Sequence, residues 1–101
     1  MRPFVILGSK PGQFRTEPGP GLAVVEAWEF RAAGRLRARF VIAQLQADTR
    51  ITITEDEPPH VVNSVPTKFL PRFATLQAAR DELAQLTRRA GEGTSLRAVE
   101  P

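Results

Sequence analysis

The chain of 101 residues contains no cysteine and no tyrosine, and it has only one histidine. The absence of cysteine excludes disulfide bonds, a thiolate nucleophile, and zinc or iron–sulfur centres held by cysteine. One histidine without a second makes a poor metal site. We therefore expect no metal, no cofactor and no catalytic set, and the sequence favours a non-enzymatic function.

Long apolar runs are also missing. The opening segment has only Phe4 to Leu7, which is far too short for a signal-peptide core or a membrane span. We expect no membrane association and a cytoplasmic location. The net charge of +3 gives a mild bias towards anionic partners, although such a small excess can serve solubility alone.

Two segments near the start have opposite characters. Pro3 to Ser9 predicts a largely buried strand, because four apolar residues in a row precede turn residues. Residues 10–21 are rich in proline and glycine, and we expect them to form a loop.

Leu22 to Leu45 predicts a β-hairpin whose register follows from its side chains. A three-residue loop that ends at Gly34 pairs Phe30 with Leu36 and Trp28 with Ala38, so that the aromatic rings share one face. A two-residue loop would place the same rings opposite arginines. The three-residue loop is the prediction.

A further strand and a helix follow the hairpin. A turn at Ala47–Asp48 is expected to send Thr49–Glu55 back into the same sheet, with Ile51 and Ile53 beside Ile42. Downstream, Thr75 is a candidate helix cap, Gly91 supplies a stop, and residues 94–99 predict a short last strand. The apolar face of the helix is formed by Leu76, Ala79, Leu83, Leu86 and Ala90.

These elements predict an α+β fold in one small domain over residues 1–101. Its sheet is an antiparallel β-meander of about four to five strands, packed by one C-terminal amphipathic helix. No internal repeat is visible in the sequence.

The hairpin also carries a candidate anion-binding face. In the predicted register, four arginines share the face opposite the aromatic rings, namely Arg31, Arg35, Arg37 and Arg39. Such a face can bind phosphates, but an RNA-reading sheet would need exposed aromatic rings beside them. A solvated face that discourages aggregation is the simpler interpretation, and nucleic-acid binding is the alternative function.

The most unusual segment spans residues 57–74, which we call the arm. It is rich in proline and therefore unsuited to helix or central strand, yet it carries many apolar side chains. One interpretation is that it closes the open end of a thin core. The other is that it presents an apolar and basic knob to another protein. The candidate partner-binding residues are Val65, Lys68, Phe69, Leu70, Arg72 and Phe73.

The sequence thus favours a non-catalytic accessory or protein-interaction protein. A small subunit of a multicomponent bacterial enzyme and a homo-oligomer joined through sheet edges both fit this class. An enzyme site would have to gather His60 with Asn63, Lys68 and Arg72, and His60 has no carboxylate or serine at a recognisable spacing.

Overall fold

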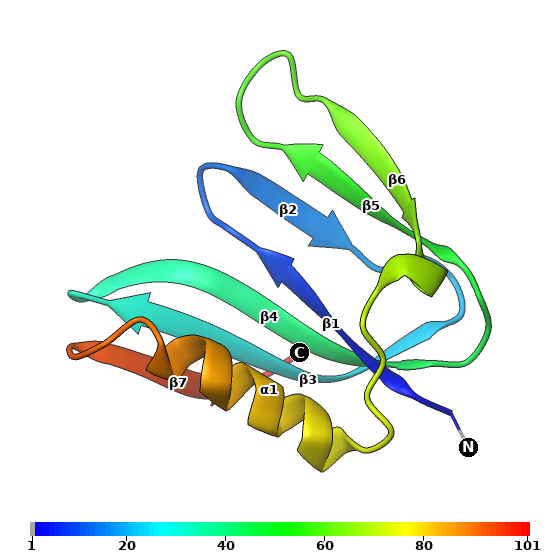
Figure 1. Cartoon of the computed structure of the whole chain (residues 1–101). Coiled ribbons are helices and arrows are strands. Elements are labelled where there is room, and N and C mark those ends of the chain that lie inside the picture. The colour runs from blue at the N-terminus through cyan, green and yellow to red at the C-terminus, as the bar shows by residue number, and fades with distance from the viewer. Residues whose placement is uncertain (1) are drawn as a thin grey trace.

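The computed structural model describes residues 2–101. Within them it contains seven strands, one α-helix and one 3₁₀ turn (Figure 1). In chain order these are β1 (Phe4–Ser9), β2 (Phe14–Glu17), β3 (Leu22–Ala32), β4 (Arg35–Leu45), β5 (Arg50–Glu55), β6 (Val62–Pro66), the turn η1 (Thr67–Phe69), α1 (Leu76–Arg88) and β7 (Thr94–Val99).

The strands form two antiparallel sheets. The first has four strands in the order β1-β4-β3-β7, and the second has three in the order β2-β5-β6. Figure 1 shows α1 packed alongside the first sheet, whereas the second sheet diverges from the helix. The predicted fold class is confirmed: the chain is α+β, with a meander-like antiparallel sheet packed by a single C-terminal helix.

The predicted register of the β3–β4 hairpin was wrong by one residue beside the turn and by two residues between Phe30 and Glu26. The turn uses only Ala33 and Gly34, whose φ angles of 52° and 73° are both positive, as in a type I′ turn. A bulge that leaves Arg37 unpaired then shifts the register, and Phe30 pairs with Ala38. A two-residue loop alone would have placed the side chains of β4 on the face opposite to the predicted one. The extra residue of the bulge returns them to the predicted face. The aromatic rings therefore still share one face.

The strand β5 does not continue the meander, contrary to the prediction. It pairs with β2 and β6 in the second sheet and makes no ladder with β4. Ile51 and Ile53 consequently pack against Val5 and Leu7. Burial of apolar side chains explains this arrangement. Val5 and Leu7 lie on the face of β1 that α1 cannot cover, and β5 covers them there.

The predicted loop over residues 10–21 contains the strand β2, so that prediction was wrong in part. Lys10 and Phe14 exchange two backbone hydrogen bonds of 2.9 and 3.0 Å, which reverse the chain tightly. Phe14 and Thr16 are half-buried, whereas Arg15 and Glu17 are exposed. This alternation has the period of a strand, and it is the signal that the proline and glycine content obscured.

The first sheet separates two apolar cores. Val5, Leu7, Ala43 and Ile51 form the core between the two sheets. On the other face, the core against the helix is built around Ile42, Ala79 and Leu83. The strands β1 and β4 therefore bury side chains on both faces, which explains why Phe4 to Leu7 is a continuous apolar run.

The helix begins where the sequence predicts, but it ends at Arg88, three residues before Gly91. The side chain of Thr75 accepts a hydrogen bond of 3.0 Å from the Ala78 amide and so caps the N-terminus. The predicted last strand is present as β7, which pairs with β3 at the edge of the first sheet.

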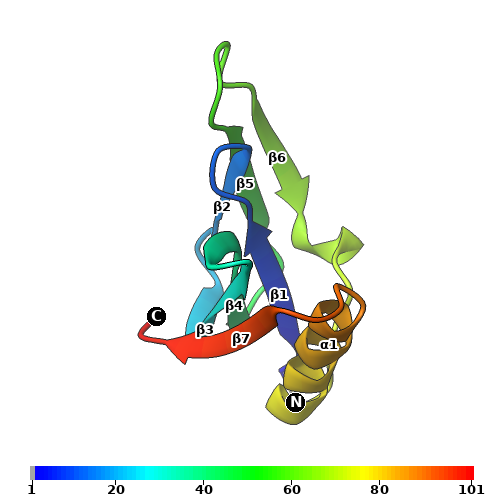
Figure 2. The same ribbon diagram turned by 90° about the vertical axis from the view of Figure 1, so that its left-hand side faces the viewer.

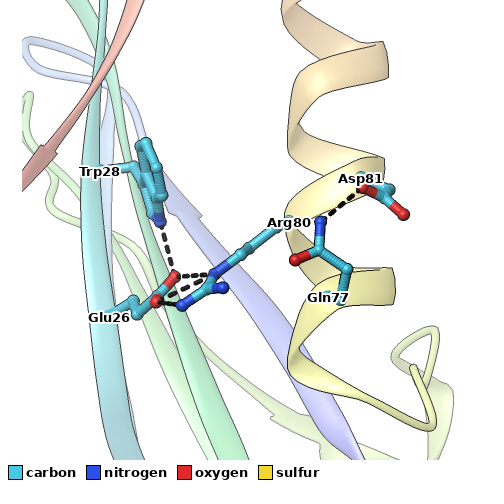
Figure 3. Close-up of polar contacts among 5 residues, drawn as sticks. All are labelled: Glu26, Trp28, Gln77, Arg80 and Asp81. Atoms are coloured by element: carbon cyan, nitrogen blue, oxygen red, sulfur yellow. Dashed lines mark hydrogen bonds and ion pairs between the residues drawn. The ribbon is translucent and has the colours of Figure 1, made fainter.

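A polar contact fixes the helix against the sheet (Figure 3). Arg80 Nε lies 3.0 Å from both carboxylate oxygens of Glu26, and Trp28 Nε1 donates to the same carboxylate at 3.1 Å. These donors, Arg80 foremost, lower the pKa of Glu26 below its usual value. Glu26 is therefore ionised near neutral pH and holds the first half of α1 at a defined position over β3.

Within residues 2–101, the structure has no helix of the length and apolar character that a bilayer crossing requires.

Candidate interaction groove

The arm divides its apolar residues between the core and the surface. Val65 and Leu70 pack against the core between the sheets, and Phe73 packs against the core beside the helix. Arg72 pairs with Asp48 at 2.9 Å. Residues 62–66 form β6 at the edge of the second sheet, where Pro66 is tolerated. Three of the six predicted partner-binding residues thus contribute to the apolar cores.

The exposed part of the arm is the η1 turn. The Phe69 side chain is 70% exposed, more than any other large apolar residue in the part of the chain that the structure describes. Lys68 Nζ lies 5.2 Å from the centre of its ring, at the distance of a cation–π contact. We call Lys68 and Phe69 the knob.

The knob has a rigid base. Thr67 is completely buried, and its hydroxyl accepts a bond of 3.1 Å from the Thr49 amide and donates one of 3.0 Å to the Thr49 carbonyl. The Thr67 amide donates to the same carbonyl at 2.9 Å. These three bonds attach η1 to the segment that joins β4 to β5.

The next fixed point of the arm is Phe73. It exchanges two backbone hydrogen bonds with Phe4, each 2.8 Å long. The arm therefore crosses the outer edge of β1 before α1 begins, as Figure 1 shows. This crossing sets Pro71 and Phe73 opposite the helix.

An open groove lies between the arm, β1 and the helix. Its volume is about 430 Å³. Seven residues line it: Ile6, Gly8, Phe40, Pro71, Phe73, Glu82 and Leu86. We call it the α1 groove. Glu82 is the only charged residue among these, and none of the ion pairs made by residues 2–101 includes it.

The groove exists because the C-terminal half of α1 is incompletely covered. Leu83 is fully buried, but Leu86 on the same apolar face is 41% exposed. Small residues on the strands below leave the space open. At Gly8 an added Cβ would stand 3.3 Å from the Phe40 ring, so Gly8 allows that ring to lie against β1.

A second hollow of about 300 Å³ continues from the first, and Phe40 and Leu86 line both. Lys10 and Arg37 line this second hollow. The combined surface therefore has an apolar floor, a carboxylate at one part of its rim and two cationic side chains at another. An apolar centre with a polar rim is the usual anatomy of a protein-binding surface.

The four predicted anion-binding arginines do not form one stripe. Arg31 and Arg39 lie together, because both contact the Glu29 carboxylate, at 3.3 and 3.5 Å. Arg35 pairs with Ala32 in the turn region, and Arg37 is the bulged residue beside the second hollow. The altered register explains this separation.

Sequence reasoning missed the fifth arginine of the region. Arg97 in β7 pairs in register with Glu29 on one side, and Arg39 in β4 pairs with Glu29 on the other. Its contribution depends on the pairing of β7 with β3, which no local pattern specifies.

The residues of the predicted enzyme site are spread along the arm. His60 precedes β6, whereas Lys68 and Arg72 follow it. His60 is exposed, and its Nδ1 lies 3.2 Å from the Glu55 carbonyl oxygen. No cluster of three metal-ligating side chains occurs in the described residues.

Comparison with protein-family models, curated proteins and solved structures finds no match to this chain. The function proposed below therefore depends on the geometry of the groove.

The groove residues outside the arm were also missed as a site. The sequence assigns Ile6, Phe40 and Leu86 to the core, and each has the apolar character of a core residue. Leu86 differs from the other apolar residues of α1 because it lies in the last turn. There the C-terminal end of the helix lies over two small residues, Gly8 and Ala38. Without the strand order, those small residues cannot be placed beneath it.

Proposed function

We propose that this chain is a non-catalytic protein-interaction module that binds an apolar segment of a protein partner in the α1 groove. The observation that carries the proposal is the open apolar surface around Phe40 and Leu86, with Glu82 on one side and Lys10 and Arg37 on the other. An accessory subunit is the kind of protein that such a site suits, because it acts through what it contacts. A cytoplasmic location stays a prediction.

The site can be tested with peptides selected on the immobilised chain from a random phage-displayed library. We expect binders whose affinity falls at least about tenfold with Leu86→Glu, because the new carboxylate would be desolvated against an apolar ligand. Val62→Glu is the matched control, since Val62 is also apolar and is 62% exposed on β6. Binders that tolerate Leu86→Glu as well as they tolerate Val62→Glu would contradict the proposal.

Nucleic-acid binding by the arginine-rich face stays a prediction. Glu29 contacts Arg31 and Arg39 and so neutralises part of their charge. A nucleic-acid affinity that decreases with salt and depends on Arg39 and Arg97 would support it, and a salt-independent result would remove it.

A further inference from the structure

The chemistry of the groove matches an exposed element of the same chain. The groove offers apolar side chains beside one carboxylate, that of Glu82. The knob offers one aromatic ring beside one ammonium group. Both the Phe69 ring and the Lys68 head are exposed to solvent. The Glu82 side of the groove and the knob therefore carry opposite charges beside apolar side chains, whereas Lys10 and Arg37 line the hollow on the other side of Phe40 and Leu86.

The spacing of the two surfaces also agrees. Glu82 and Leu86 are four residues apart on α1, so their side chains lie about 5–6 Å apart on one face of the helix. On the knob, the Lys68 ammonium lies 5.2 Å from the centre of the Phe69 ring. A ring placed against Leu86 would thus bring the ammonium to the Glu82 carboxylate.

The segments that carry the knob and the groove lie on the same side of β1. Figure 2 shows the η1 turn and α1 projecting from the same side of β1. Pro71 lines the groove only two residues after the knob ends. Adjacent complementary surfaces on one molecule suit an isologous two-fold dimer, in which the knob of each copy binds in the groove of the other.

We propose that the α1 groove receives the Lys68–Phe69 knob of a second copy of this chain, and that the contact is reciprocal. The Phe69 ring packs between Phe40 and Leu86, and Lys68 pairs with Glu82. This inference rests on the proposed function, because it names the partner of the same groove. An aromatic anchor in an apolar pocket with a charged pair beside it is a common source of binding energy.

The charged pair allows a test that keeps the fold intact. We would compare the wild-type chain with Lys68→Glu, Glu82→Lys and the double variant, using the molecular mass from sedimentation over a dilution series that reaches roughly 1 mM. Both side chains are at the surface or half-buried, and neither forms an ion pair within residues 2–101. Neither reversal should therefore prevent folding, which circular dichroism would verify.

The expected result is dimerisation of the wild-type chain. Each single reversal should raise the dissociation constant at least about tenfold, because it brings like charges together. The double variant should recover most of the affinity. An equimolar mixture of the two single variants should also dimerise, since each groove then meets a knob of opposite charge. Arg15→Glu, an exposed reversal on β2, serves as the control and should leave the dimer unchanged.

Three results would overturn the inference: a wild-type chain that stays monomeric over the series, single reversals that dimerise as the wild type does, or a mixture that stays monomeric. The proposed function is judged separately by the selected peptides. A monomeric chain that still binds Leu86-dependent peptides would reject the second copy as the partner and retain the groove as a protein-binding site.

Discussion

Replacing Leu83 with alanine is expected to lower the free energy of unfolding by about 2–5 kcal/mol, whereas Leu86→Ala should cost less than about 1 kcal/mol. Leu83 is fully buried among Ile42 and Ala79, so its truncation leaves a cavity in the core beside the helix. Leu86 is 41% exposed and loses little buried surface.

The two leucines form a matched pair. They lie on the same apolar face of α1, and both substitutions change helix propensity by the same amount, so the difference reports burial alone. Urea denaturation of both variants measures it. An equal loss of stability would mean that the end of α1 is packed as tightly as its middle, and the α1 groove would then be closed.

Thr67→Val is expected to lower the free energy of unfolding by about 1–3 kcal/mol. Valine has nearly the shape of threonine but cannot accept the hydrogen bond from the Thr49 amide, which would be left without its partner. The Thr49 carbonyl keeps the bond from the residue 67 amide, so the loss is confined to one donor. Urea denaturation again provides the measurement.

The control for this prediction is Thr67→Ser, which keeps the hydroxyl and removes only the methyl group. It should retain more stability than Thr67→Val. The opposite order would show that apolar packing, and not the hydrogen bonds to Thr49, holds η1 in place. Because η1 carries Phe69, a loosened turn should also weaken any binding that uses the knob.

Local patterns in the sequence specify α1 and β1 well, but they did not reveal β2 or β6. The cap at Thr75, the spacing of Ala79 and Leu83, and the apolar run in β1 each depend on residues close in the chain. These predict α1 and β1 correctly because capping and burial of one face act over a few residues. The fold class follows from the same elements.

Pairings between distant residues could not be predicted in the same way. The bulge at Arg37 changes the register of β3 and β4 without a local signal, and it separates the four arginines that the sequence places together. The assignment of β5 to a second sheet depends on which face of β1 remains uncovered. Both outcomes are decided by burial over the whole molecule.

The arm shows both what local patterns predict and what they leave open. Its proline content correctly excludes an α-helix and a central strand, and Leu70 and Phe73 do help to close the cores. The sequence cannot separate these side chains from Phe69, which has the same apolar character and yet faces solvent. Only the anchoring of Thr67 and Phe73 on either side fixes which residue points outward.

The central claim is that the α1 groove is open in the free chain and becomes covered when its partner binds. Because the chain has no cysteine, single-cysteine variants report the accessibility of one position each. The measurement is the rate at which a small maleimide modifies Leu86→Cys, compared with Leu83→Cys as the buried reference and Val62→Cys as the exposed one.

We expect Leu86→Cys in dilute solution to react at a rate close to that of Val62→Cys and far faster than Leu83→Cys. A saturating groove-binding peptide should slow Leu86→Cys and leave Val62→Cys unchanged. A Leu86→Cys thiol as unreactive as Leu83→Cys in the free chain, or one whose rate the bound peptide does not alter, would contradict the claim.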